Sequence, residues 1–158
     1  MELKIGNKVY TVEFSVGASL CADCVEKTTS FMMATINAEG KSAVKSIISN
    51  MTELPQTALA MLYGGLQKHH GRRGDNTVTS LDDAEDLLME YILENKDKDN
   101  GNYFDLVGLF IGQMELDGFF DMIGLTKLIQ MGTKTAKPKK TPQDHKKKAT
   151  QSEKVTEK

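Results

Sequence analysis

The 158-residue sequence contains no tryptophan, only three prolines and only two cysteines. Two cysteines, Cys21 and Cys24, are too few for the disulfide framework of a small secreted protein. The N-terminus has no charged leader followed by an apolar run, so no signal peptide is expected. The longest charge-free run in the most apolar region, Leu106–Met114, is about half as long as a membrane-crossing helix. These absences favour a soluble, intracellular protein with no membrane partner.

Charge is distributed unevenly, although the net charge of the whole chain is only −2. Residues 133–158 hold nine lysines, no arginine and three acidic residues, a formal charge of +6. Residues 1–132 therefore keep 11 of the 20 basic and 19 of the 22 acidic residues, a formal charge of −8. We expect one compact domain over 1–132. We expect a disordered Lys-rich tail over 133–158, because it has too few apolar residues to offset the entropy of ordering.

Nucleic acid is not an expected partner of the acidic domain, since phosphate binding needs clustered Lys and Arg. The Lys runs of the tail come with no aromatic residue for base stacking and no Arg for base reading. A solvated tail is the simpler interpretation. Contact of the tail with an acidic partner, or with the acidic body of this protein, is the alternative.

Two strands are predicted at the N-terminus, Glu2–Ile5 and Lys8–Phe14. They flank Gly6-Asn7, a dipeptide that tolerates the positive φ of a two-residue hairpin loop. The second strand places its large apolar residues on one face: Tyr10, Val12 and Phe14. An isolated hairpin is marginal in water, so this face is expected to pack on helices.

Apolar residues at helical spacing predict about five helices after the hairpin. Ser19 is the expected N-cap of the first helix, and Gly40 precedes the second. Pro55 fits the first turn of a third helix. The fourth begins at Ser80 with a Ser-x-x-Asp capping pattern, and the last begins near Asn102. The predicted fold class is α+β, mainly α-helical: an N-terminal β-hairpin packed on a bundle of about five helices, followed by the tail.

Three short motifs could carry chemistry, and none is complete. The Cys-x-x-Cys pair at Cys21 has zinc or redox spacing, but two further zinc ligands and a βαβ context are missing. His69-His70-Gly-Arg-Arg has no glycine-rich phosphate cradle and no nucleophile motif beside it. The calcium-like loop at Asp97 has Gly108 where the EF-hand needs glutamate. We therefore expect no enzyme, no cofactor and no metal site.

The apolar C-terminal part of the domain is the remaining candidate for function. Most of its large residues are expected in the core. Those beyond Gly118 are expected to be exposed, because a short Gly-flanked segment has little left to pack under, and exposed apolar area marks a docking surface. The predicted partner-binding residues are Phe104, Phe110, Met114, Phe119, Phe120, Ile123, Leu125 and Leu128.

The order of these segments is similar to that of a known family. A Leu3-Lys-Ile-Gly-Asn-Lys-Val-Tyr hairpin precedes helices and the stretch Leu59-Ala-Met-Leu-Tyr-Gly-Gly-Leu-Gln-Lys-His-His-Gly71. An acidic helix over Ser80–Asn95, then Phe104-Asp-Leu-Val-Gly-Leu-Phe and a polar tail, follow. Over roughly the first 125 residues, the chain resembles the tail assembly chaperones of long-tailed phages that infect Gram-positive bacteria.

The resemblance implies a binding protein that is not an enzyme. Such chaperones are thought to coat the tape measure protein, a very long and largely helical chain, until tail tube protein polymerises around it. It also implies a homo-oligomer in the host cytoplasm that is absent from the mature virion. A longer product made by ribosomal frameshifting near the Lys-rich codons is a further hypothesis.

The physical argument agrees with that expectation. A helical protein with a groove of Leu, Phe and Met can hold amphipathic helices reversibly, and Met adapts to different helix faces. Three alternatives stay open: a different small adaptor that docks on a basic partner, a nucleic-acid-associated protein acting through its tail, and a thiol or zinc protein.

Overall fold

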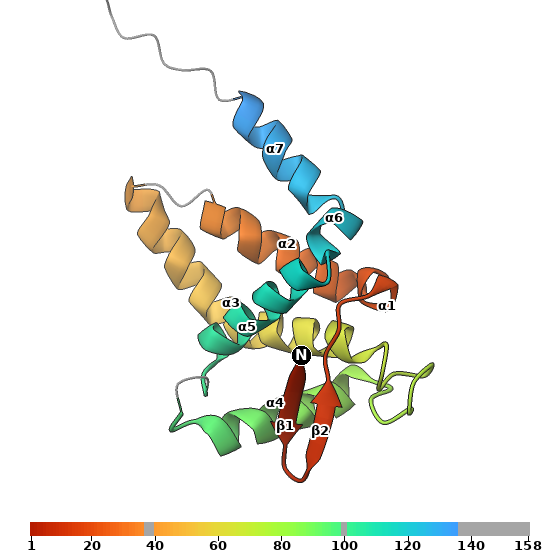
Figure 1. Cartoon of the computed structure of the whole chain (residues 1–158). Coiled ribbons are helices and arrows are strands. Elements are labelled where there is room, and N and C mark those ends of the chain that lie inside the picture. The colour runs from red at the N-terminus through yellow and green to blue at the C-terminus, as the bar shows by residue number, and fades with distance from the viewer. Residues whose placement is uncertain (37–39, 99–100, 136–158) are drawn as a thin grey trace, which may run out of the picture.

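The structure, a computed structural model, describes the backbone of residues 1–36, 40–98 and 101–135, and the side chains of 1–36, 51–98 and 101–131. The described part is a mainly helical α+β fold, as predicted (Figure 1). A two-stranded hairpin is followed by seven helices, where about five were predicted. Five of these helices are longer than ten residues. Most of the predicted disordered tail, residues 136–158, lies outside the described residues.

The hairpin has the predicted turn. Strands β1 (Glu2–Ile5) and β2 (Lys8–Thr11) pair antiparallel, with Leu3 opposite Tyr10. Gly6 in the loop has a φ of +57°, the left-handed conformation that glycine adopts without steric cost. The apolar face of the hairpin is buried, and it continues past β2 through two further buried residues, Val12 and Phe14.

The helices follow in the order α1 (Val16–Ser19), α2 (Ala22–Ile36), α3 (Gly40–Leu66), α4 (Leu81–Asn95), α5 (Tyr103–Leu116), α6 (Phe119–Met122) and α7 (Leu125–Thr135). The predicted starts of α4 and α5 are confirmed. Ser80 and Asp83 form a complete capping box, and the Asn102 side chain accepts from the Asp105 N–H. Each cap satisfies a backbone donor that the first helical turn leaves without a partner.

Three predicted boundaries are wrong. Ser19 is the last residue of the short helix α1, which Ser15 caps by accepting from the Gly17 N–H. Pro55 lies inside α3, so the predicted second and third helices are one continuous helix of 27 residues. The second strand, predicted to run to Phe14, ends at Thr11. Ser19 lies about one turn from the true cap of α1, Ser15, whereas Pro55 lies far from both ends of α3.

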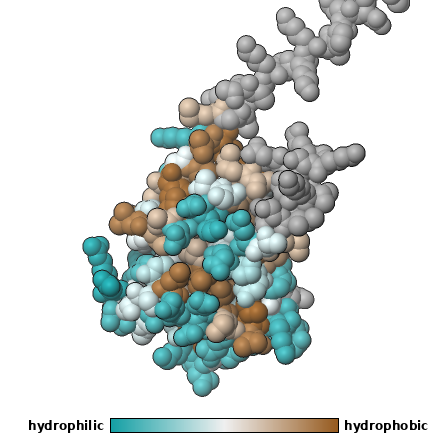
Figure 2. All heavy atoms as spheres, turned by 180° about the vertical axis from the view of Figure 1, so that it is seen from behind, coloured by the Kyte–Doolittle hydropathy of each residue, from teal (hydrophilic) through white to brown (hydrophobic). Residues whose placement is uncertain are grey.

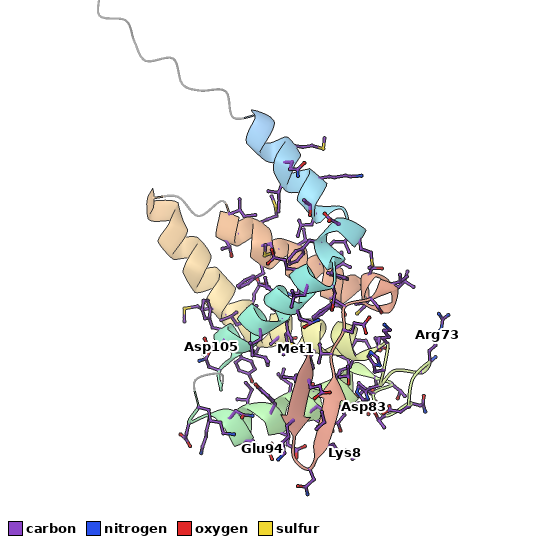
Figure 3. All side chains as sticks on the ribbon, viewed as in Figure 1. Met1, Lys8, Arg73, Asp83, Glu94 and Asp105 are labelled. Carbon is purple, nitrogen blue, oxygen red and sulfur yellow. The ribbon has the colours of Figure 1, made fainter. Side chains whose placement is uncertain are left out.

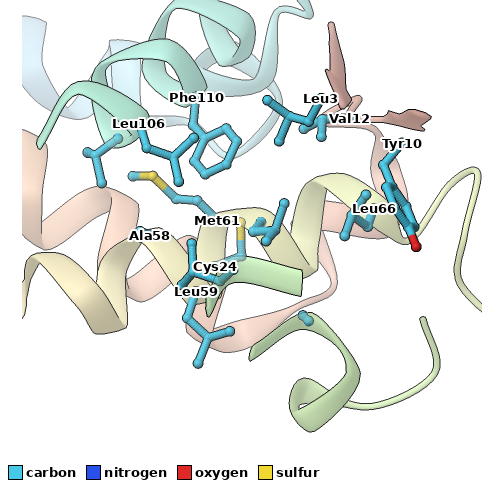
Figure 4. Close-up of a cluster of buried hydrophobic side chains, with 14 of the residues drawn as sticks. Leu3, Tyr10, Val12, Cys24, Ala58, Leu59, Met61, Leu66, Leu106 and Phe110 are labelled. Carbon is cyan, nitrogen blue, oxygen red and sulfur yellow. The ribbon is translucent and has the colours of Figure 1, made fainter. Parts of the chain in front are cut away.

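Helix α3 is the centre of the fold and packs against α1, α2, α4 and α5. Figure 4 shows Met61 of this helix in the buried cluster with Leu106 and Phe110 of α5. The ring of Phe14 joins the same core, with its centroid 5.6 Å from that of Phe119 and 6.2 Å from that of Phe110. The hairpin, α3, α5 and α6 therefore share one apolar core.

The Tyr-Gly-Gly part of the family-like stretch is a packing device. A Cβ atom at Gly64 would lie 2.5 Å from the Cys24 sulfur of α2. A Cβ atom at Gly65 would lie 2.5 Å from Cγ1 of Val12. The Gly65 carbonyl also accepts from the Glu13 N–H at 2.9 Å. The two glycines let α2 and the segment after β2 approach α3 closely, which requires the absence of a side chain.

Candidate docking surfaces

Helix α5 buries one face and exposes the other. Its buried residues, which face the core, are Leu106, Val107, Phe110 and Met114. The opposite face carries two large apolar residues that are well exposed, Phe104 at 64% and Leu116 at 83%. An amphipathic surface helix carries polar residues on its outer face, so these two are unusual.

An open hollow of about 660 Å³ lies along this outer face, and we call it the α5 groove. Its lining residues are Met1, Phe104, Asp105, Gly108, Leu109, Gly112, Gln113, Glu115 and Leu116. Figure 3 shows two of them, Met1 and Asp105, on the same side of the molecule. The charged side chains in this lining are Asp105 and Glu115, both acidic, and the α-amino group of Met1 donates to the Val12 carbonyl. The groove is thus apolar along its length and acidic near both ends.

The floor of the α5 groove contains two glycines without an internal packing role. A Cβ atom at Gly108 or at Gly112 would meet nothing within 4 Å. Glycine inside a helix costs about 0.5–1 kcal/mol relative to alanine. At Gly64 and Gly65, by contrast, close neighbours leave no room for a Cβ atom. The cost at Gly108 and Gly112 is not offset by any contact within the described fold.

Helices α6 and α7 form a second candidate surface. Gly118 and Gly124 have φ of +68° and +77°, and these left-handed residues turn the chain before α6 and before α7. Helix α7 projects from the body and packs mainly on α6 (Figure 1). In Figure 2 hydrophobic atoms gather at the upper end of the molecule. Three large apolar residues among the described side chains of α6 and α7 are at least 45% exposed: Met122, Leu128 and Met131.

The eight predicted partner-binding residues divide into three groups. Four are buried in the core and present no surface in this conformation: Phe110, Met114, Phe119 and Leu125. Two are partly buried and pack against the core, Phe120 and Ile123. Two are exposed, Phe104 and Leu128. The expectation that residues beyond Gly118 are generally exposed is wrong for Phe119 and Leu125, because α6 folds back onto the core.

The expected exposure beyond Gly118 is confirmed for Met122 and Met131, although neither belongs to the predicted partner-binding set. Sequence reasoning missed Leu116, which is exposed before Gly118 and is also absent from that set. The signal that could have revealed the α5 groove is a spacing of four, which places Phe104, Gly108, Gly112 and Leu116 on one helix face.

The two adjacent histidines hold the hairpin against the C-terminal end of α3. His70 is buried, and its Nε2 accepts from the Thr11 N–H at 2.9 Å. His69 contacts the Glu13 carboxylate at 2.9 Å, and Lys68 also pairs with Glu13. Hydrogen bonds from Lys68 first, and then from His69, lower the pKa of Glu13. The contacts of both histidines are structural.

The two cysteines lie in different environments. Cys24 is fully buried, and burial raises the pKa of its thiol to about 12, so the reactive thiolate is disfavoured. Cys21 is partly exposed, and both cysteines are free. In the part of the chain that the structure describes, no group of three or more His, Cys, Asp or Glu side chains could hold a metal ion.

No protein-family model, curated protein or solved structure matches the chain. Among the helices of the described residues, none combines the length and the apolar character needed to cross a membrane.

Proposed function

We propose that this protein is a phage tail assembly chaperone. It binds helical segments of the tape measure protein, keeps that long chain from aggregating and helps recruit tail tube protein. The observation that supports the proposal best is the α5 groove, an apolar, glycine-floored and acidic-ended surface on a small helical body. Binding is its activity, and no covalent bond is made or broken.

The groove defines the chemistry of the segment that it would hold. An amphipathic helix lays its apolar face into such a groove, with anchors at i, i+3, i+4 and i+7. The open floor at Gly108 and Gly112 lets the backbone of a client helix approach closely. Asp105 and Glu115 favour a client with Lys or Arg beside its apolar stripe, because unlike charges steer the encounter.

The affinity of a single segment is expected to be low. One helix on one groove buries less area than a stable protein–protein interface of about 1,600 Å². A long client carries many segments, so several chaperone molecules on one chain give avidity without strong single contacts. Weak single contacts also allow tail tube protein to displace the chaperone.

The test is co-expression of the full chain with the tape measure protein of the same phage. The variant Phe104→Ser/Leu116→Ser removes both apolar ends of the α5 groove. Its control is Leu93→Ser, which removes a leucine that is 70% exposed on α4, away from the groove. We expect the control to keep the tape measure protein in the supernatant and to co-purify with it. With the double variant, most of the tape measure protein should leave the supernatant, and little should co-purify. Equal retention by both would refute the proposal.

A further inference from the structure

Helix α7 has the chemistry that the α5 groove selects. Within Leu125–Thr135 the charged residues are Lys127 and Lys134, and there is no acidic residue. Two of its apolar residues are exposed, Leu128 at 50% and Met131 at 68%. At 100° per residue, Lys127, Leu128 and Met131 fall within roughly a third of the helix circumference. An exposed apolar strip with a lysine beside it is thus present on the chain itself.

The dimensions also agree. Helix α7 has 11 residues, which gives a length of about 16 Å at 1.5 Å per residue. The distance along α5 from Phe104 to Leu116 is about 18 Å by the same rise. In the structure α7 lies against α6 of its own chain, and the groove of that chain stays open. A groove and a helix that fit one another, but do not meet within one molecule, can meet between two.

We propose that α7 of one copy docks in the α5 groove of a second copy. Leu128 and Met131 lie over the floor formed by Gly108 and Gly112, and Lys127 lies near an acidic end of the groove. Such a contact joins two different surfaces, so it is head-to-tail and can continue from copy to copy. A symmetric contact between the α5 grooves of two copies is disfavoured, because it brings Asp105 and Glu115 of the two copies together.

The docked α7 helix regulates access of a client to the α5 groove. This consequence rests on the proposed function. An α7 helix and a client helix occupy the same surface, so each excludes the other. Free chaperone then associates with itself, and a client segment displaces α7 because many segments are linked in one chain. The exposed apolar surface of the free protein is covered while no client is present.

The first measurement is the weight-average mass of the full chain at about 100 µM by sedimentation equilibrium, a concentration chosen because so small an interface is weak. Wild type should exceed the 17.5 kDa of one chain, and by less in 500 mM salt than in 50 mM salt. Gly112→Leu fills the groove floor, where its side chain meets open space. Met131→Asp removes the exposed strip of α7. Each variant alone should be monomeric, whereas Leu93→Asp on α4 should behave as wild type.

Mixing the two variants makes the test specific. Gly112→Leu still offers α7, and Met131→Asp still offers an open groove, so an equimolar mixture should form dimers of one copy of each. A monomeric wild type, a mixture that stays monomeric, or a Met131→Asp chain that still self-associates would overturn the inference.

The two proposals fail separately. Met131→Asp should hold the tape measure protein at least as well as wild type, because its groove is open. If it does so while wild type never self-associates, the inference fails and the proposed function stands. If the mixing result is as expected but Gly112→Leu holds the tape measure protein as well as wild type, then the α5 groove is not the client site.

Discussion

Nε2 of His70 accepts a hydrogen bond from the backbone N–H of Thr11 at 2.9 Å. Because Nε2 accepts, the ring proton of the neutral histidine is on Nδ1, where it donates to the Asp75 carboxylate at 2.9 Å. The ring also meets Tyr10 edge-on, with centroids 5.1 Å apart. One side chain therefore joins β2, the end of α3 and the loop before α4.

Replacing His70 by alanine should destabilise the fold clearly. The Thr11 N–H loses its acceptor, and a poorly solvated donor without a partner costs about 1–3 kcal/mol. The matched variant is His69→Ala, which removes a partly exposed contact with Glu13 worth less than about 1 kcal/mol. Urea unfolding at pH 7 measures both free energies. A loss at His69 as large as the loss at His70 would show that the Thr11 bond contributes little.

The pH dependence of stability should reveal Asp75. Hydrogen bonds from the Thr77 hydroxyl first, and from His70, lower the pKa of Asp75 to about 2. A carboxyl group whose pKa is lower in the folded state stabilises the fold above its ordinary pKa near 4 and loses this contribution as the pH falls toward 2. Wild type should therefore melt at a higher temperature than Asp75→Asn at pH 6. The difference in melting temperature should shrink between about pH 4 and pH 2, and a constant difference over that range would contradict the assignment.

Glycines inside two helices should respond to alanine in opposite directions. Gly64→Ala places a Cβ atom 2.5 Å from the Cys24 sulfur, so α2 and α3 must move apart, at a cost of about 1–3 kcal/mol. Gly112→Ala meets open space and gains about 0.5–1 kcal/mol, because alanine loses less backbone entropy in a helix. Thermal melts of the two variants against wild type measure both changes. A stabilising Gly64→Ala would mean that this helix contact is looser than described.

Features that depend on neighbouring residues in the chain could be predicted from the sequence. The Gly6-Asn7 loop, the capping pattern at Ser80 and the helix start near Asn102 depend on a few neighbouring residues, and the structure confirms all three. Pro55 has a local preference for the first helical turn, but it lies inside α3. The long helix is held by its contacts with four other helices, which no local pattern reveals.

The exposure of the proposed partner-binding residues could be predicted only in part, for the same reason. Phe104 and Leu128 belong to the predicted set and are exposed. Phe119 was assigned to the surface because it follows Gly118 in a short segment, but its ring packs on Phe14, more than a hundred residues away in the chain. Helical periodicity gives the faces of a helix, and the side on which the core lies depends on such distant partners.

The two cysteines should differ sharply in reactivity. Cys24 is buried beneath α3, and its thiol has a pKa of about 12, so the thiolate that reacts with iodoacetamide is scarce. Cys21 is partly exposed and accessible to the reagent. Brief alkylation of the native protein at pH 8 should label Cys21 alone, whereas alkylation in 8 M urea should label both. Peptide mass spectrometry identifies the sites, and rapid native labelling of Cys24 would indicate that α2 opens readily.

Two phenylalanines of the C-terminal region should separate folding from binding. Phe119 is fully buried against Phe14, and its ring is tied to the same core as Phe110. Phe119→Ala leaves a cavity and should cost about 3–5 kcal/mol. Phe104 is 64% exposed on the α5 groove, so Phe104→Ala should change the free energy of unfolding by less than about 0.5 kcal/mol.

Binding should rank the two variants in the opposite order from stability, provided that it is measured under conditions in which both variants are folded. Phe104→Ala removes an apolar end of the α5 groove, so recovery of the tape measure protein should fall, although the variant melts like wild type. Phe119→Ala leaves the groove lining intact, and at a temperature well below its melting point it should recover more of the tape measure protein than Phe104→Ala does. Circular dichroism melts establish the folded range, and co-purification within it gives the comparison. Better recovery by Phe104→Ala would indicate that the client binds to the surface that Phe119 supports, α6 and α7, and not to α5.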